Sequence, residues 1–174
     1  MKGSRYWIDA LALVEHPQAG YYREVYRSSC VLSASALPAG FGGDRAACTD
    51  IYYLLERGQF GALHRLKSDE MWHFYQGDAL KVHVITTDGE HSFFRLGPDP
   101  DAGEVLLGVV PAGAWFGSCL EGDGSYALVG CTVSPGFDFE DSEMGERDQL
   151  IRQYPQHAAV IEALTKPGEA GGGT

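Results

Sequence analysis

Residues 61–77 read GALHRLKSDEMWHFYQG, and this stretch decides the predicted fold. It holds two histidines and a glutamate among aromatic residues, with a glycine at each end. Successive side chains of an extended strand point to opposite faces, so Glu70, Trp72 and Phe74 are expected to share one face while His73 lies on the other. A glutamate on an otherwise apolar face is costly to bury without a partner. The pattern therefore makes Glu70 a candidate pocket residue.

The segment that follows supplies a further histidine. Gly77-Asp78 is typical of a two-residue hairpin turn leading into a strand over residues 79–87. Such a turn would pair Trp72 with His83, and directly paired residues point to the same side. His83 is therefore expected to join Glu70, although one residue more or less in the loop would reverse this. A histidine satisfied within a strand, with no functional role, is the alternative for His83.

Composition limits the classes of function. A chain of 174 residues with 44% hydrophobic and 21% charged residues predicts one globular domain, assigned to residues 1–167, and a disordered glycine-rich tail over residues 168–174. The net charge of −11 argues against nucleic acid and anionic membranes as partners. No long apolar run and no signal-peptide core are present, so a soluble, cytoplasmic protein is expected. Four widely spaced cysteines without a C-x-x-C pair predict free thiols.

The order of the predicted elements is a helix, many strands, and helices again. Apolar spacing predicts a helix over residues 6–14, and residues 146–164 are helical with an interruption at Tyr154-Pro155. A glycine- and alanine-rich loop is expected over residues 34–49. Short strands are predicted between turn signals, over residues 21–29, 50–57, 70–75, 80–87, 92–96, 105–110, 115–120 and 126–133. Short strands without intervening helices indicate an all-β sandwich or barrel.

Two stretches carry a family resemblance. The spacing of His64, Leu66, Glu70 and Gly77 is similar to the first cupin motif, G-x5-H-x-H-x3-4-E-x6-G, and residues 111–116 (PAGAWF) resemble the second, P-x-G-x2-H. More narrowly, HPQAGYYREVYRS, IYYLLERGQFGALHRLKSDEMWHFYQGDAL, VVPAGAWF and VSPGFDFED resemble a small uncharacterised cupin group of bacteria and fungi. The resemblance runs over nearly the whole chain. It implies a jelly-roll β-barrel, usually a homodimer, related in shape to the deoxysugar epimerases.

The chain departs from the metal-binding pattern that the resemblance implies. Metal-binding cupins hold a divalent ion with three histidines and a glutamate, but here Leu66 and Phe116 occupy two of the histidine positions. His64 and Glu70 alone are too few, because typical sites draw three or four ligands from the protein. We therefore predict no metal and no other cofactor, with a divalent metal held by His64, Glu70 and His83 as the alternative. An organic small-molecule ligand is expected instead.

Resemblance to the sugar epimerases implies roles for the polar residues of this pocket. A barrel histidine removes a proton next to a carbonyl in those enzymes, and a tyrosine returns one. His64 is accordingly the candidate general base, Glu70 would orient or assist it, and Tyr53 or Tyr22 would supply the proton. Arg65, beside His64, is expected to point away from the barrel and to pair with Asp69 or Glu24.

Aromatic residues are predicted to wall the pocket. Trp72, Phe74, Trp115 and Phe116 offer flat apolar surfaces suited to an aromatic, nucleobase or sugar ring, and core filling is the alternative role for each of them. Tyr22 and Glu24 share a face of the strand that follows Gly20, and they join His83 as predicted substrate-binding residues. The acidic block PGFDFEDSE, residues 135–143, is expected to be a solvated segment anchored by Phe137 and Phe139.

Three functions of different classes follow from these patterns. The first is a metal-independent isomerase, epimerase or dehydratase acting on a sugar-like or cyclic metabolite. The second is a non-catalytic cupin that binds a small molecule. The third is a metal-dependent cupin oxygenase or isomerase.

Overall fold

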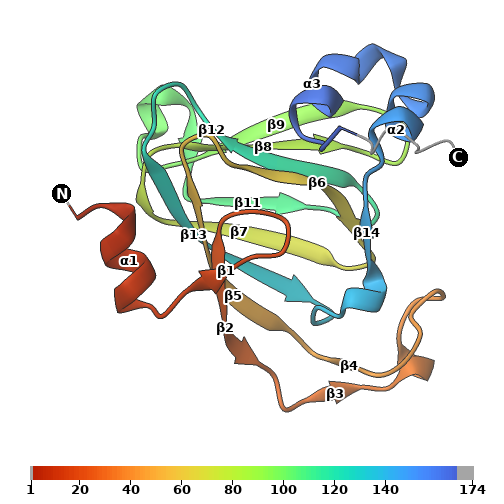
Figure 1. The fold of residues 1–174 in the computed structure, drawn as a ribbon. Helices are drawn as coiled ribbons and strands as arrows, with labels where there is room; N and C mark the ends of the chain where they lie inside the picture. The colour runs from red at the N-terminus through yellow and green to blue at the C-terminus, as the bar shows by residue number, and fades with distance from the viewer. Residues whose placement is uncertain (1, 168–174) are drawn as a thin grey trace, which may run out of the picture.

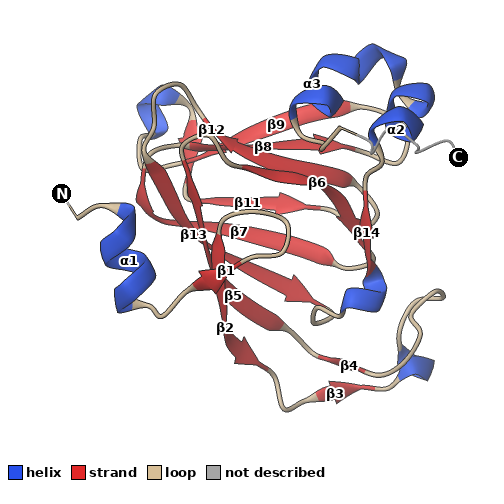
Figure 2. Ribbon diagram, viewed as in Figure 1, coloured by secondary structure: helices blue, strands red, loops and turns tan. Residues whose placement is uncertain are grey.

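Two facing β-sheets of six strands each form a jelly roll in the computed structural model, which describes residues 2–167 (Figure 1). Helices lie at the periphery of the strands (Figure 2). The first sheet contains, in spatial order, β1 (Val14–Glu15), β2 (Tyr21–Arg27), β5 (Thr49–Glu56), β13 (Tyr126–Ser134), β7 (Asp69–Gly77) and β11 (Leu107–Val110). The second contains β10 (Glu104–Val105), β9 (His91–Leu96), β8 (Leu80–Ile85), β12 (Trp115–Leu120), β6 (Phe60–Leu66) and β14 (Ser142–Met144). The predicted mostly-β jelly roll with terminal helices is confirmed.

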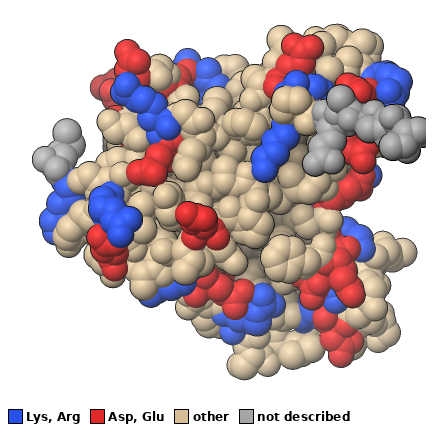
Figure 3. Space-filling model, in the orientation of Figure 1, with Lys and Arg blue, Asp and Glu red and all other residues tan. Residues whose placement is uncertain are grey.

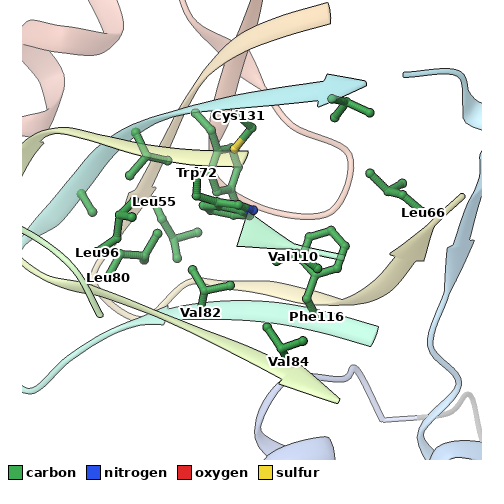
Figure 4. Packing of buried hydrophobic residues seen from close by; sticks show 14 of the residues in the cluster. Leu55, Leu66, Trp72, Leu80, Val82, Val84, Leu96, Val110, Phe116 and Cys131 are labelled. Atoms are coloured by element: carbon green, nitrogen blue, oxygen red, sulfur yellow. The ribbon is translucent and has the colours of Figure 1, made fainter. Parts of the chain in front are cut away.

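The core between the sheets follows from strand alternation. Leu80, Val82 and Val84 of β8 point inward at every second position, and β13 is buried along nearly its whole length because it lies near the middle of the first sheet. Figure 4 shows these side chains converging around Trp72. The buried core residues are Tyr53, Leu55, Leu66, Trp72, Leu80, Val82, Val84, Leu96, Val110, Ala114, Phe116, Ala127, Val129, Cys131 and Val133. All four cysteines are free, as predicted, and Cys131 is buried in this core.

The predicted hairpin between β7 and β8 is wrong. β7 pairs with β13 and β11 in the first sheet, whereas β8 pairs with β12 and β9 in the second. Gly77-Asp78 does form a turn, with Gly77 at a φ of 104°. The Asp78 backbone N–H donates to the Tyr126 carbonyl, and its carboxylate accepts from the Ser125 N–H. These bonds hold Asp78 at the start of β13, where the chain crosses from the first sheet to the second.

Residues 60–66 form a strand that the sequence patterns did not single out. β6 pairs with β12 and β14 in the second sheet, and it carries His64. The predicted loop over residues 34–49 contains a short 3-10 helix, η1 (Ala34–Ala36), and a small ribbon formed by β3 (Val31–Leu32) and β4 (Arg45–Ala46). Two further 3-10 helices, η2 (Pro100–Ala102) and η3 (Phe139–Asp141), lie in loops.

The helices cover the outer faces of the two sheets. α1 (Ser4–Ala10) is shorter than predicted, because the backbone turns at Ala12 and Val14 already pairs in β1. The C-terminal helices are confirmed, including the break at Tyr154-Pro155, as α2 (Arg147–Gln153), η4 (Pro155–His157) and α3 (Ala158–Ala163). They pack on the second sheet through Leu63, Ile85, Trp115, Leu150, Tyr154, Ile161 and Leu164. Over residues 2–167, no helix is long and apolar enough to cross a membrane. The predicted tail lies outside the described residues.

Candidate functional site

A cavity of about 380 Å³ opens between the two sheets. Seven of the nine predicted site residues line it: Tyr22, Glu24, Tyr53, His64, Glu70, Trp72 and Phe116. Its other lining residues come from the loop before β2, from neighbouring strands and from the segment around η3: His16, Pro17, Gln18, Arg27, Thr49, Ile51, Gly61, Leu66, Gly117, Ser118, Cys131, Val133, Phe137, Asp138, Phe139 and Ser142. The centre of the face in Figure 3 is mostly uncharged, and charged side chains lie mainly around it.

His64 enters the cavity from β6, opposite Phe116 of β12. Their ring centroids are 4.1 Å apart. The Nδ1 atom lies 2.8 Å from the Ala62 carbonyl oxygen, which can only accept, so Nδ1 carries the proton and Nε2 is left as an acceptor. Burial lowers the pKa of His64 to about 4. His64 is therefore a neutral imidazole at pH 7 whose Nε2 is available to a ligand.

A bulge brings the neighbouring residues of β6 and β12 into the cavity wall. The register shifts between Phe116 and Ser118, so that β6 has one residue more than β12 over this span. Bulges of this kind redirect side chains and are frequent beside functional sites. A Cβ at Gly61 would lie 2.5 Å from the Ser118 hydroxyl oxygen, so only glycine leaves room for that hydroxyl.

Glu70 is the buried acid of the cavity. It lies on β7 with 6% of its surface exposed, and its Oε2 atom has no hydrogen-bond partner. Burial raises the pKa of Glu70 to about 7, while a hydrogen bond with the Cys131 thiol opposes this shift. The carboxyl group therefore exchanges its proton near neutral pH. No hydrogen bond joins Glu70 to His64 among the described residues, and the Ala62 carbonyl orients His64 instead.

Two buried hydrogen-bond donors of the cavity also lack partners. The indole nitrogen of Trp72 and the hydroxyl of Ser118 make no hydrogen bond within residues 2–167. Trp72 packs edge-to-face on Tyr53 and Phe116, and Figure 4 shows its nitrogen at the end of the ring nearer Leu66 and Phe116. Buried polar groups are normally satisfied, so such atoms in a cavity wall indicate a bound molecule or water.

His16 of the loop before β2 packs against Tyr22 of β2 and Tyr53 of β5 in the cavity wall. The Tyr53 hydroxyl donates to the Ala19 carbonyl at 3.1 Å, and burial raises its pKa. His16 packs edge-to-face on Tyr22. The Gln18 backbone N–H donates to Nδ1 of His16, so the proton of the neutral ring lies on Nε2. Sequence reasoning missed His16 as a site residue, although the stretch HPQAG was part of the resemblance.

An ion pair lies at the edge of the cavity. Arg27 donates to both carboxylate oxygens of Glu24, at 3.1 and 2.6 Å, and to the Phe137 carbonyl oxygen. The Glu24 carboxylate raises the pKa of Arg27. Sequence reasoning predicted Glu24 as a site residue and missed Arg27, three positions further along the same exposed strand.

The acidic block is anchored differently from the prediction. Phe137 packs against the core, whereas Phe139 is 73% exposed and contacts Phe137. The anchor is Asp141, which is buried and accepts from Nε and Nη2 of Arg45 at 2.6 and 3.0 Å. Lys67 adds a second ion pair to Asp141 at 3.1 Å. This buried pair ties the segment around η3 to β4.

Two predicted binding residues lie outside the cavity. His83 is on β8, where Nδ1 lies 3.0 Å from Nε2 of His91. It has no part in the cavity because Leu80, Val82 and Val84 take the inward positions of β8 and His83 points to the outer face of the sheet. Phe74 packs against the core between the sheets, the alternative role foreseen for it. His73 faces away from the cavity as predicted, 3.1 Å from the Thr132 hydroxyl. Arg65 pairs with Glu143 at 2.6 Å rather than with Asp69 or Glu24.

The donor set of the cavity does not fit a metal. Leu66 and Phe116 line it beside His64 and Glu70, and neither can ligate an ion. His83 is too far removed to serve as the third ligand of the alternative set. Within the part of the chain that the structure describes, no three His, Cys, Asp or Glu side chains are grouped to hold a metal.

Comparisons with known proteins agree with this architecture. An uncharacterized protein of Saccharomyces cerevisiae, YML079W, is 32% identical over 169 residues, which covers 90% of this chain and 83% of the yeast protein. The structure of a hypothetical protein from Leishmania major has a TM-score of 0.86 and 38% identity, covering 95% of this chain and 100% of that chain. The structure of protein SO0799 from Shewanella oneidensis has a TM-score of 0.84 and 40% identity, covering 96% of this chain and 99% of that chain.

More distant similarity shows the fold alone. A mutant of oxalate decarboxylase OxdC from Bacillus subtilis has a TM-score of 0.52 and 15% identity, covering 89% of this chain and 37% of that chain.

The model of one protein family, described as Cupin superfamily (DUF985), matches residues 5–145. The chain therefore belongs to this family, Cupin_5.

Proposed function

We propose that this protein is a metal-independent proton-transfer enzyme of the isomerase, epimerase or dehydratase type, acting on a small ring-bearing metabolite. The observation that carries the proposal is Glu70, a buried carboxyl group in the cavity with one unpartnered oxygen and a pKa of about 7. A general acid or base works best when its pKa lies near the operating pH, and burial is the usual way to raise a carboxyl group to that value.

Glu70 replaces His64 as the principal proton carrier in this scheme. In its ionised form, the Glu70 carboxylate takes a proton from a carbon next to a carbonyl group of the substrate. His64, with a pKa of about 4, is too weak a base to compete, but its Nε2 can accept a hydrogen bond from a substrate hydroxyl. This reassigns the roles that the epimerase resemblance implied for the two residues.

The unpartnered donors stabilise the charge that develops on the substrate. When the proton leaves carbon, its electron pair moves onto the carbonyl oxygen, and the Trp72 N–H and Ser118 O–H are the buried donors able to receive that oxygen. A proton returned to the opposite face of the same carbon completes an epimerisation, and one returned to another carbon completes an isomerisation. Loss of a neighbouring hydroxyl with a proton gives dehydration.

A second group must return the proton. The Tyr53 hydroxyl is engaged with the Ala19 carbonyl, so Tyr22 and the Nε2–H of His16 are the better candidates in the cavity wall. Both lie on the side of the loop before β2, whereas Glu70 projects from β7. One group can therefore remove the proton while another returns it from a different direction, as a change of proton position requires.

Deuterium exchange tests the proposal without knowledge of the product. Cyclic carbonyl compounds that raise the thermal unfolding temperature are incubated with the protein in D₂O, and deuterium at carbon is measured by mass spectrometry. We expect catalysed exchange, and we expect Glu70→Gln to lower its rate by about a hundredfold or more, the usual contribution of a general base.

His73→Gln is the matched control, because His73 lies on the same strand as Glu70 and faces away from the cavity. It should keep the full exchange rate. The proposal is contradicted if bound compounds do not exchange, if Glu70→Gln exchanges as fast as the unaltered protein, or if a chelator abolishes exchange. Binding without exchange would favour the non-catalytic alternative.

A homodimer remains a further proposal, and exposed apolar residues of the edge strand β11 support it. Leu107 and Val109 are each 50% exposed there. Unprotected apolar edge strands tend to associate, so proteins generally cover them. Light scattering should give twice the chain mass of 18.9 kDa, and a monomer at micromolar concentration would contradict the proposal.

A further inference from the structure

We infer that the cavity selects uncharged ring compounds bearing a hydrogen-bond acceptor and excludes anionic ones, including phosphorylated sugars. This inference rests on the proposed function, since it names the substrate class of the same site. Three features of the cavity support it independently: the charge of its lining side chains, its hydrogen-bond donors without partners, and the shape of its aromatic walls.

The cavity wall offers no free positive charge. Arg27 is the only lysine or arginine among the described lining residues, and Glu24 holds it in a two-oxygen ion pair. Asp138 lines the same cavity and Glu70 lies deep within it, so the acidic groups outnumber the basic one. An anionic ligand would meet like charges in a partly desolvated space. Sites that bind phosphate or carboxylate groups are built from unpaired Arg, Lys or backbone N–H groups, and this wall lacks such side chains.

The deep polar atoms match a neutral acceptor on the ligand. The Trp72 indole nitrogen can only donate, so it requires an acceptor that the described residues do not provide. The Ser118 hydroxyl is also buried without a partner and can donate to a ligand acceptor. His64 Nε2 offers the complementary acceptor for a hydroxyl or N–H on the ligand. A ring that carries a carbonyl group and a neighbouring hydroxyl or N–H satisfies these atoms together without bringing a charge.

The walls fit a flat ring of modest size. Trp72, Tyr53 and Phe116 meet edge-to-face, with centroids 6.1 and 6.3 Å from Trp72. A volume of about 380 Å³ lies near the lower end of small-molecule pockets, roughly 300–1,000 Å³. The cavity therefore has room for one ring with short substituents, and a sugar nucleotide would extend into the acidic edge.

Matched fragments test the inference by nuclear magnetic resonance. The probes are benzamide against benzoate, nicotinamide against nicotinate, and a ring-fragment library with equal numbers of neutral and anionic members. The readout is the Trp72 indole N–H resonance, assigned with Trp72→Phe. Trp115 is the internal control, because its indole nitrogen is also buried and unpartnered but lies outside the cavity.

Neutral fragments should shift the Trp72 resonance and leave that of Trp115 in place. Their anionic counterparts should bind at least about tenfold more weakly, since like charges in a partly desolvated site repel strongly. Carboxylates that bind as well as the amides would overturn the inference. So would the failure of every neutral fragment to shift Trp72.

A variant tests charge as the cause. Glu24→Gln releases Arg27 from its carboxylate partner and should raise the affinity for benzoate several-fold, narrowing the difference from benzamide. Asp9→Asn is the matched control, because it removes the carboxylate of the exposed Arg5–Asp9 pair on α1, away from the cavity. If Glu24→Gln leaves the ratio of benzamide to benzoate affinity unchanged, charge is not the cause of the selectivity.

The outcomes for the two proposals are separable. Neutral ligands that bind at Trp72 without deuterium exchange would overturn the enzymatic function and leave the ligand class standing. Anionic ligands that undergo Glu70-dependent exchange would overturn the ligand class and leave the enzymatic function standing.

Discussion

Two histidines of this protein have a lowered pKa of about 4 in two different settings. His64 owes it to burial within the cavity. His83 owes it to burial and to the neighbouring imidazole of His91 on the outer side of the second sheet. Nδ1 of His64 is bound to a backbone carbonyl, which leaves Nε2 for a ligand, whereas Nδ1 of His83 is engaged with His91. His157 extends the outer group, with its ring centroid 5.3 Å from that of His91.

The difference shows that a shifted pKa alone does not mark a binding site. Around His64 lie buried polar atoms without partners, on Glu70, Trp72 and Ser118. Around His83 the charged side chains are paired, since Lys81 and Arg95 each lie 2.7 Å from the Glu121 carboxylate. Unpartnered atoms around a cavity distinguish a place prepared for a ligand from a place that is internally satisfied.

The largest expected effect comes from restoring two metal ligands. The double variant Leu66→His/Phe116→His would place four donors around the cavity, with His64 and Glu70. We expect it to bind Zn²⁺ or Ni²⁺ at least about a thousandfold more tightly than the unaltered protein, because structural sites with four ligands bind far more tightly than sites with two. Isothermal titration calorimetry measures this gain. If the double variant gains no metal affinity, the four positions do not converge on one point. As a control, adding His83→Ala to the double variant should leave the gain in affinity intact.

The second effect is a change in how stability depends on pH. The pKa of Glu70 is raised from its ordinary value of 4.5 to about 7 in the folded state. Its protonated form therefore stabilises the fold fully at pH values below 4.5, and this stabilisation is lost as the pH rises through about 7. Glu70→Gln removes this loss. Relative to the unaltered protein, the free energy of unfolding of this variant should rise by about 2.5 kcal/mol between about pH 5 and about pH 8.5.

Urea unfolding at both pH values measures the difference. The histidines have the opposite sign, since a lowered pKa contributes stability above the ordinary value of 6.5 that is lost as the pH falls toward 4. Comparing the variant with the unaltered protein at each pH removes their contribution. A pH-independent effect of Glu70→Gln would contradict a raised pKa.

The smallest effect is expected at His83. Because it lies outside the cavity, His83→Gln should leave ligand binding unchanged while reducing the loss of stability on acidification. His64→Gln is the counterpart, and it should weaken binding of hydroxyl-bearing fragments. Thermal shift at two pH values and fragment titration measure both. Weaker fragment binding in His83→Gln would break the distinction between the two regions.

The jelly roll and most of the cavity residues could be predicted from the sequence. The cupin-like spacing of His64, Glu70 and Gly77 identified the fold, and strand alternation put Glu70 and Trp72 on the same inward side. The position of His83 could not be obtained this way, because local turn chemistry does not reveal whether the chain folds back or crosses to the other sheet. In the structure, the bonds from Asp78 to Tyr126 and Ser125 decide this, and they depend on residues far along the chain.

Other site features depend on contacts between distant segments. The burial that lowers the pKa of His64 and raises that of Glu70 exists only once the two sheets are packed together. His16 and Arg27 were missed because a histidine before a proline and an arginine on an exposed strand carry no pattern of their own. The loop of residues 16–20 and the Glu24–Arg27 pair bring them to the cavity.

The most direct test of the central claim is the titration of the two cavity groups in the unliganded protein. Carbon-13 and nitrogen-15 resonances assigned with Glu70→Gln and His64→Gln report each protonation state. We predict that Glu70 titrates at about 7 and that His64 stays neutral at about pH 7 with its proton on Nδ1. A Glu70 that titrates near its ordinary 4.5, together with a His64 that protonates near 6.5 or carries its proton on Nε2, would contradict the account.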